Sequence, residues 1–196
     1  MSKEEIYNLL IETGRDLVKD KGATFLTARK LSEASFCSVG TIYNQFSNMD
    51  NFILAQNMVT LDELNLKMLQ VKTDEDDYKN LNRYLDAFVE FVLENQNLWF
   101  LLYNYHLNPS GKKLSGIYLR KLVAVTSFWR EPFSKVFKKI TAKKRNLALQ
   151  VLWLSVFSMS SFLTTQTLNG FGKINKRTVC KVLLNAYLAG LASIRT

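Results

Sequence analysis

Apolar residues recur at helical spacing along nearly the whole chain of 196 residues, and little interrupts them. The chain holds 8 glycines and 2 prolines, about 5% of its residues, where roughly 12% is usual. Because these residue types end helices and make turns, the elements must be long. No stretch alternates apolar and polar residues with a period of two for long enough to form a strand. The sequence therefore predicts an all-α fold.

Capping residues and helix breakers divide the chain into about nine expected helices. The first ends near Gly22, two short helices follow Thr27 and Ser38, and a long one follows Asn48. The acidic run 74–77 is expected to be a solvated connector whose carboxylates favour the N-terminus of the next helix. Pro132 should kink or split a helix over about 115–140, because proline lacks the amide proton. The other helices are expected over about 78–92, 98–107, 142–168 and 176–194, with breakers at 108–111 and 169–170.

The net charge of +9 is unevenly distributed along the chain. Residues 1–50 carry a net charge of −1, residues 51–110 carry −5, and residues 111–196 carry +15. Cys37 and Cys180 lie far apart, so neither a disulfide framework nor a thiolate metal site is expected. Acidic residues stand near the N-terminus, where a signal peptide needs basic ones. The sequence predicts a cytoplasmic protein.

The uncharged stretch 146–172 follows a basic group and has the length of a membrane span. Because Ser, Thr and Gln side chains interrupt it, we expect a helix buried on most sides, including against a partner chain, and no stable membrane insertion. The basic group is expected to be a solvated face, and the alternatives are an anionic effector, an extra phosphate contact or a membrane surface. Its members are Lys135, Lys138, Lys139, Lys143, Lys144 and Arg145.

Residues 27–46 show the pattern of a short helix, a tight turn and a second short helix. Leu31 and Ala34 would bury the first of these helices, and Ile42 and Phe46 the second. The remaining face of the second helix presents uncharged donors and acceptors that can reach base edges or phosphates in the major groove of DNA. The sequence thus predicts a helix-turn-helix.

Residues 6–54 resemble the DNA-binding headpiece of the TetR family of bacterial transcriptional regulators. The family signature is a small residue, then Gly-Thr-aliphatic-Tyr and a closing aromatic; here residues 38–46 are Ser-Val-Gly-Thr-Ile-Tyr-Asn-Gln-Phe. The rest of the chain matches the family in the number, order and length of its expected helices. The matching residues are Gly22, Thr27, Leu31, Ser38, Gly40, Thr41, Ile42, Tyr43, Phe46 and Phe52.

The resemblance implies a helix-turn-helix DNA-binding domain over 1–50 and a helical effector-binding and dimerisation domain over 51–196. It implies a ligand-responsive regulator, expected to be a repressor, that binds a near-palindromic double-stranded DNA operator as a homodimer. The last two helices would form the dimer interface, and an unknown small-molecule effector would release the DNA. The expected DNA contacts are Thr27, Ser38, Val39, Gly40, Thr41, Tyr43, Asn44 and Gln45, with Arg29 and Lys30 as secondary candidates.

For three of these residues the sequence leaves another interpretation open. Tyr43 could pack inside the headpiece, because tyrosine serves both environments. Asn44 and Gln45 could simply be exposed to solvent.

The chain departs from the family pattern at three points. Phe36 stands where the family usually has a turn glycine, and Met49 replaces a lysine that contacts a phosphate. Residues 1–50 also lack a net positive charge. Binding should therefore depend on neutral donors and helix N-termini more than on released counterions.

Aromatic residues are dense in the C-terminal part, where the resemblance implies an effector pocket. Mostly apolar walls with a few polar groups are typical of a small-molecule site, but the same residues could be core. The only histidine of the chain could supply a hydrogen bond there. The candidate pocket residues are Phe88, Trp99, Tyr103, His106, Trp129, Trp153 and Phe157.

Other classes of function find less support in the sequence. One histidine, two distant cysteines and no glycine-rich phosphate loop give no nucleophile and base pair, so we expect neither enzymatic activity nor a cofactor or metal site. A helical membrane-surface or lipid-binding protein that uses the basic C-terminal half is the alternative to a DNA-binding regulator.

Overall fold

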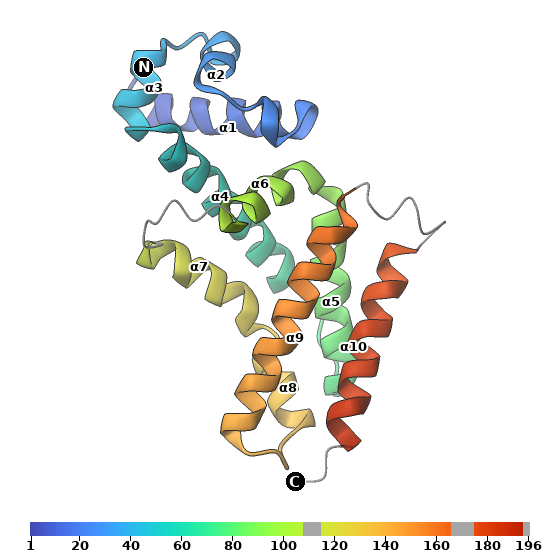
Figure 1. Ribbon diagram of the computed structural model, residues 1–196. Coiled ribbons are helices and arrows are strands. Elements are labelled where there is room, and N and C mark those ends of the chain that lie inside the picture. The colour runs from blue at the N-terminus through green and yellow to red at the C-terminus, as the bar shows by residue number, and fades with distance from the viewer. Residues whose placement is uncertain (108–114, 166–174, 194–196) are drawn as a thin grey trace. The chain divides into compact units, whose positions relative to one another are not determined.

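The computed structural model describes residues 1–107, 115–165 and 175–193 (Figure 1). Over these residues the chain forms ten α-helices, one short 3-10 helix and no strand, which confirms the predicted all-α fold. The elements are α1 (Lys3–Lys21), η1 (Ala23–Phe25), α2 (Ala28–Ser35), α3 (Val39–Phe46), α4 (Met49–Leu69), α5 (Asp77–Glu94), α6 (Gln96–Leu107), α7 (Gly116–Ser127), α8 (Arg130–Val136), α9 (Ala142–Leu163) and α10 (Lys176–Ser193).

The expected helix over about 115–140 is split in two, as Pro132 led us to predict. It forms α7 and α8, and Pro132 is the third residue of α8. In the first turn of a helix no amide needs an acceptor in the preceding turn, so proline is tolerated there. Helix α9 ends at Leu163, before the expected position 168. The expected breakers at 108–111 and 169–170, and the expected end of the last helix at 194, lie outside the described residues.

Two helices begin at side-chain caps that the sequence indicated. Asn48 accepts a hydrogen bond from the Asn51 amide at 2.8 Å, ahead of α4. In the acidic run, Asp76 accepts from the amides of Tyr78 and Lys79 at 2.9 and 3.2 Å. The run therefore caps α5, since these amides have no acceptor within the helix.

The structure consists of two compact units. The first unit contains Met1–Asp62 and the segment that starts at Asn95, and the second contains Glu63–Glu94 and the segment that starts at Ser115. The first unit thus holds α1 to α3, most of α4, and α6. The boundary expected at residue 50 divides the chain by function, into a DNA-binding domain and an effector-binding and dimerisation domain. This functional division stays a prediction.

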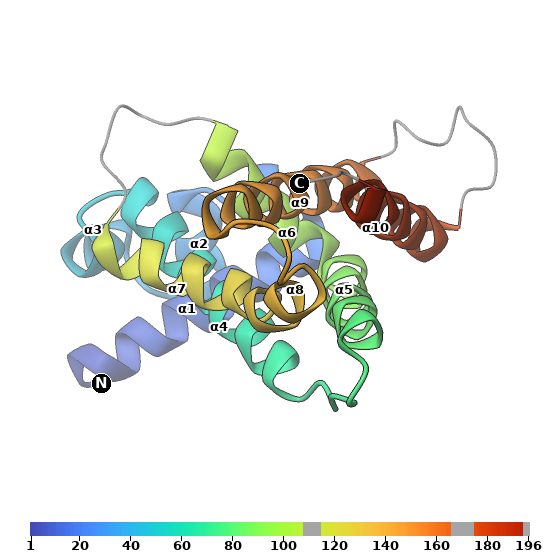
Figure 2. The same cartoon turned by 90° about the horizontal axis from the view of Figure 1, so that it is seen from below.

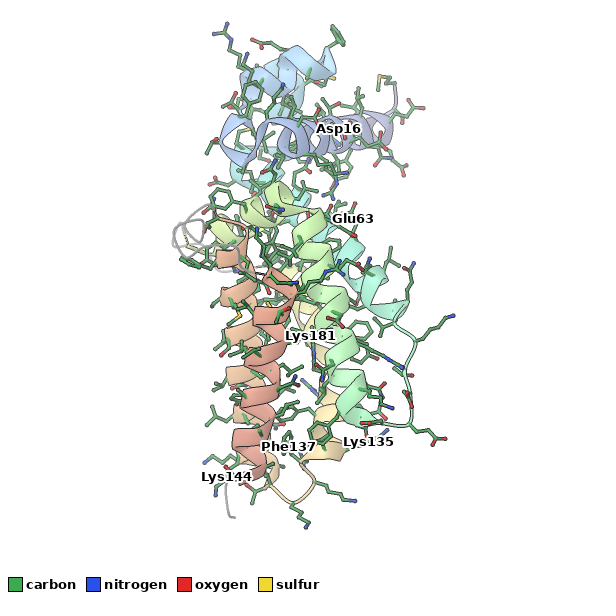
Figure 3. All side chains as sticks on the ribbon, turned by 90° about the vertical axis from the view of Figure 1, so that its right-hand side faces the viewer. Asp16, Glu63, Lys135, Phe137, Lys144 and Lys181 are labelled. Carbon is green, nitrogen blue, oxygen red and sulfur yellow. The ribbon has the colours of Figure 1, made fainter. Side chains whose placement is uncertain are left out.

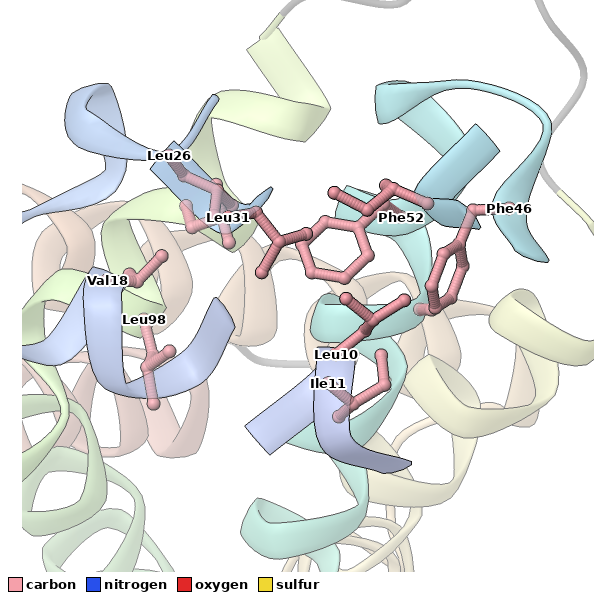
Figure 4. Close-up of a cluster of buried hydrophobic side chains, with 11 residues drawn as sticks. Leu10, Ile11, Val18, Leu26, Leu31, Phe46, Phe52 and Leu98 are labelled. Carbon is pink, nitrogen blue, oxygen red and sulfur yellow. The ribbon is translucent and has the colours of Figure 1, made fainter. Parts of the chain in front are cut away.

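The core of the first unit joins the three N-terminal helices to α4 and α6 (Figure 4). The ring of Phe52 meets the ring of Phe46 edge-on, with centroids 4.9 Å apart. Burial of such side chains is the main favourable contribution to folding. The buried members are Leu10, Ile11, Val18, Leu26, Leu31, Ile42, Phe46, Phe52, Ala55, Leu98 and Leu101.

Polar contacts within the first unit tie α1 to α4. Arg15, which is 6% exposed, donates to the Gln56 carbonyl at 3.3 Å and to the Thr60 hydroxyl at 3.1 Å. The Gln56 amide donates to the Ile11 carbonyl at 2.9 Å. A Cβ atom on Gly14 would lie 2.5 Å from the Phe52 ring, so only glycine permits this close approach of the helices.

The second unit packs α5, α7, α8, α9 and α10 around a core of its own. Figures 1 and 2 both show α9 and α10 side by side, and the chain runs along them in opposite directions. The Tyr187 hydroxyl on α10 donates to the Ala148 carbonyl on α9 at 2.7 Å. Helix α10 also contacts α5, where Lys181 pairs with Asp86 at 2.9 Å. Residues buried there include Phe88, Val92, Trp129, Phe133, Leu152, Val156, Leu184 and Leu188.

Helices α9 and α10 also carry apolar side chains that are exposed. Among the described residues, α9 is the one helix with the length and apolar composition of a membrane span, and one third of its most apolar window is buried. Its exposed apolar residues follow one another at intervals of four, three and eight positions, so they form a stripe along one face. The exposed residues are Leu147, Val151, Leu154 and Phe162 on α9, and Val182 with the small Ala186, Ala189, Gly190 and Ala192 on α10.

The basic group lies around the start of α9 (Figure 3, where Lys135 and Lys144 are labelled). Lys135 pairs with Glu131 at 2.8 Å, and Arg145 is half-buried. The remaining four side chains, Lys138, Lys139, Lys143 and Lys144, are exposed. This is the solvated face that the sequence predicts.

Candidate nucleic-acid interface

Helices α2 and α3 form a helix-turn-helix whose two N-termini are capped by side chains. The Thr27 hydroxyl accepts from the Lys30 amide at 3.2 Å, ahead of α2. The Ser38 hydroxyl accepts from the Thr41 amide at 3.0 Å, ahead of α3. Both caps are at the positions that the sequence predicts. The N–H groups at both helix starts that remain without partners favour a negatively charged neighbour such as a phosphate.

The two helices bury one face each against the core. Leu31, Ile42 and Phe46 are buried as expected, but Ala34 is exposed. Ser35 takes the inner position instead, because it lies four residues after Leu31 and its hydroxyl donates to the Leu31 carbonyl at 2.7 Å.

The outer face of α3 carries most of the predicted DNA contacts. Val39 is 37% exposed and Tyr43 is 43% exposed, and both lie on the same face because they are four residues apart. Tyr43 is exposed and is not part of the buried core, so it does not pack inside the headpiece, which the sequence left open. We call this face the recognition surface; its exposed members are Ser38, Val39, Gly40, Tyr43 and Asn44.

Two of the predicted contacts already have partners within the first unit. Thr41 is half-buried, and its hydroxyl lies 2.9 Å from the Ser38 hydroxyl. The half-buried Gln45 donates from its amide to the Lys3 carbonyl on α1 at 3.1 Å. This amide keeps its carbonyl oxygen as an acceptor. Thr27 is exposed at the start of α2, so it lies outside the recognition surface but on the same motif.

The cations of α2 are partly neutralised by one carboxylate. Glu33 accepts from Arg29 at 2.9 Å and from Lys30 at 2.8 Å. The hydrogen bond from Lys30, and to a smaller extent the one from Arg29, holds the pKa of the Glu33 carboxyl below its usual value. These secondary candidates therefore add little net positive charge, in keeping with the net charge of −1 over residues 1–50.

The predicted pocket residues fall into both units. Trp99, Tyr103 and His106 lie on α6 in the first unit, where Trp99 is buried and the other two are half-buried. Burial lowers the pKa of His106 from its usual value, which favours the neutral imidazole.

The other four predicted pocket residues form one aromatic cluster in the second unit. The rings of Trp129 and Trp153 have centroids 5.4 Å apart. Phe88 meets Trp129 at 5.8 Å and Trp153 at 5.3 Å, and Phe157 lies 6.0 Å from Trp153. Phe88 is fully buried, so it supports the cluster as core.

A cavity of about 320 Å³ lies beside this cluster, between α7, α8 and α9. Trp129 and Trp153 are the predicted residues that line it. The sequence analysis missed its polar residues, although Asn146 and Gln150 precede Trp153 by seven and three positions and so share its helix face. A role for the three residues of α6 stays a prediction. The cavity is lined by Val123, Thr126, Trp129, Arg130, Asn146, Leu149, Gln150, Leu152, Trp153 and Val156.

No family model matches the sequence. No curated protein matches it either.

Solved structures, by contrast, match nearly the whole chain. A TetR-family transcriptional regulator from Streptomyces coelicolor is 15% identical with a TM-score of 0.70, over 97% of this chain and 82% of that one. BioQ, solved with its double-stranded DNA operator, is 14% identical with a TM-score of 0.63, over 99% of both chains. FadR from Bacillus subtilis, solved with stearoyl-CoA, is 14% identical with a TM-score of 0.69, over 94% and 98%. The chain therefore has the fold of TetR-family transcriptional regulators.

Proposed function

We propose that this chain is a TetR-family transcriptional regulator that binds a near-palindromic operator as a homodimer and releases it when a small-molecule effector binds. The observation that carries the proposal is the exposed, uncharged recognition surface on α3, which follows a capped helix start in the fold of known regulators. A recognition helix in this motif lies in the major groove, with its N-terminal residues at the base edges. Regulation of transcription requires no reaction, so we assign no catalytic residue.

The proposed contacts divide into positioning and reading. Ser38 and Thr27, at the starts of α3 and α2, would hold phosphates through hydroxyls and nearby backbone amides, which fixes the orientation of the motif on DNA. Tyr43 and Asn44 project from the recognition surface and would contact base edges.

Selection of bound sequences from a random DNA pool at a stated salt concentration tests the proposal. We expect a palindrome whose half-sites are about 34–36 Å apart. The double variant Tyr43→Ala with Asn44→Ala should lose this selection. Tyr78→Ala is the matched control, because Tyr78 on α5 is 45% exposed, close to the value for Tyr43, and should leave the selection unchanged. Recovery of the same palindrome with the double variant would overturn the assignment of the recognition surface.

A second copy of the chain is the proposed partner for the exposed apolar stripe on α9 and for α10. Leu147 and Leu154 are 61% and 62% exposed. Because exposing such apolar side chains to water is unfavourable, a stripe of them indicates a surface that a partner covers. The small residues of α10 permit two helices to approach closely. An anionic membrane surface is the competing occupant, because Lys143 and Lys144 lie at the start of the same helix.

Sedimentation and vesicle flotation separate these two occupants. A homodimer in solution that does not float with vesicles of phosphatidylserine and phosphatidylcholine supports the proposal. A monomer that floats with these vesicles would favour the lipid-binding alternative.

The cavity between α7, α8 and α9 is the proposed effector site. Its indole walls suit an apolar body, and Arg130, Asn146 and Gln150 offer donors for a polar or anionic head. Binding of stearoyl-CoA by FadR, which has the same fold, supports an amphipathic effector. A coupling of about 1–3 kcal/mol between this site and DNA would change operator affinity about 5- to 150-fold.

Dodecanoate is a suitable first probe for this site. Its binding should change the fluorescence of Trp153 and weaken operator binding, and Arg130→Ala should reduce both effects. Arg120→Ala is the matched control, because the exposed Arg120 on α7 is not among the residues that line the cavity. An amphiphile that fills the cavity without changing operator affinity would contradict effector control.

A further inference from the structure

Phe36, in the turn between α2 and α3, has two features that do not stabilise the fold. Its ring is 96% exposed, so it gains almost nothing from burial. Its φ of 57° places the backbone in the left-handed region, which costs a residue with a side chain roughly 1–2 kcal/mol. A left-handed residue commonly ends a helix, usually as glycine, so a large exposed ring at the C-cap of α2 points to a role for that ring outside the fold.

The turn that carries Phe36 is held in place by two hydrogen bonds. The Ser32 hydroxyl donates to the Cys37 carbonyl at 2.6 Å, and the Cys37 amide donates to the Ser35 hydroxyl at 3.3 Å. These contacts hold the backbone on the C-terminal side of Phe36, which ends α2 and lies just ahead of α3. A backbone that is already ordered loses less entropy on binding than a mobile one.

The recognition surface next to Phe36 continues its apolar character. Val39, the first residue of α3, lies three positions after Phe36 and is 37% exposed. Residues 34–49 carry no charged side chain. The commonest specific contact in the major groove, Arg or Lys to guanine, is therefore not available from this segment.

The apolar and amide side chains of the segment favour one base pair. Thymine carries the C5-methyl group, the apolar group that an unmodified major groove presents, and adenine pairs with it and accepts a bidentate contact from an Asn or Gln amide. Asn44 is exposed on the same helix. The apolar and amide side chains here thus match the two bases of an A·T pair, whereas the hydroxyls of Ser38 and Tyr43 do not discriminate between base pairs.

We propose that Phe36 and Val39 recognise thymine methyl groups, so that the operator half-sites contain A·T pairs at the positions that face the start of α3. This inference rests on the proposed function, because it concerns the same DNA surface. It makes Phe36, at the position of the usual turn glycine, a determinant of specificity.

Replacement of thymine by deoxyuridine tests the inference, because it removes the methyl group and keeps the base pairing. The probe is the palindrome recovered from the random pool, with one thymine per half-site changed at a time. At contacted positions we expect the affinity of the dimer to fall about fifteenfold, or about fourfold per methyl group. The Phe36→Gly and Val39→Ala variants should each bind the thymine and deoxyuridine duplexes with nearly equal affinity at the position that the replaced residue contacts.

Two control variants keep the test specific. Ser47→Gly changes the other described non-glycine residue with a positive φ, and Leu66→Ala removes an apolar side chain that is 58% exposed on α4. Both should keep the fifteenfold preference for thymine. If no palindrome is recovered, the proposed function fails. If a palindrome is recovered but deoxyuridine binds equally well at every position, or Phe36→Gly and Val39→Ala each keep the full preference, only the present inference is overturned.

Discussion

The two units of this protein place their apolar residues in opposite ways. The first unit buries most of its apolar residues in one core, with Phe36 and Val39 as exceptions at or next to the recognition surface. The buried Arg15 and Gln56 join its α1 to α4. The second unit leaves an apolar stripe on α9 exposed and holds an open cavity beside Trp129 and Trp153. The first unit is therefore complete as a folded body, whereas the second has surfaces that a partner or ligand would complete.

The largest effect we predict concerns the core that makes the first unit complete. Phe52→Ala should lower the free energy of unfolding by about 4 kcal/mol, because the fully buried ring meets Phe46 and would leave a cavity. Urea denaturation followed by circular dichroism measures this loss. Tyr78→Ala, which truncates a half-exposed ring, should cost well under 1 kcal/mol. A similar loss for both variants would contradict a closed core in the first unit.

The apolar stripe of the second unit provides the next prediction. Leu154→Glu should raise the dimer dissociation constant at least about a hundredfold, because it would place an unpaired carboxylate in an apolar interface. Analytical ultracentrifugation measures the change. Leu66→Glu is matched in exposure, 58% against 62%, and lies outside the stripe, so it should leave the dimer intact. An unchanged dimer with Leu154→Glu would show that the stripe has another role.

Removing equivalent helix caps in the two units should distinguish an effect on stability from an effect on DNA binding. Ser38 and Ser115 each accept a hydrogen bond from an amide three residues on, at 3.0 and 3.1 Å. Replacing either by alanine should cost about 1 kcal/mol of stability. Only Ser38→Ala should also weaken operator binding, by about tenfold, since it loses a phosphate contact as well. Equal operator affinities for the two variants would remove Ser38 from the interface.

The smallest predicted effect is a gain in stability. Phe36→Gly should stabilise the fold by about 0.5 kcal/mol, because relief of the left-handed backbone outweighs the extra freedom of glycine in the unfolded chain. Thermal unfolding followed by circular dichroism, with Ser47→Gly as the comparison, measures this gain. A clear loss of stability would show that the Phe36 ring packs against the fold after all.

The sequence predicted best those features that depend on neighbours along the chain. Thr27, Ser38 and Asn48 cap their helices as expected, because a cap needs only a side chain and an amide three residues away. The prediction that Ala34 is buried was wrong, since the spacing alone allowed either Ala34 or Ser35 to face inward.

Features that depend on distant parts of the chain were harder to predict. Helix α6 belongs to the first unit because Leu98 and Leu101 join its core and Asn97 donates to the Lys19 carbonyl at 2.8 Å. No local pattern indicates these contacts across nearly eighty residues. For the same reason the sequence analysis assigned the aromatic residues to one pocket only because they are dense in the C-terminal part. It missed the polar residues that line the cavity, such as Thr126 and Asn146.

The absence of charge over residues 34–49 has a consequence for the conditions under which the protein would act. Proteins that neutralise many phosphates lose affinity steeply as potassium accumulates in an osmotically stressed cell, since the release of each displaced counterion then favours binding less. A regulator that recognises DNA mainly through methyl groups, hydroxyls and amides would keep its operator occupied during such a stress. Its response would then follow its effector rather than the ionic composition of the cell.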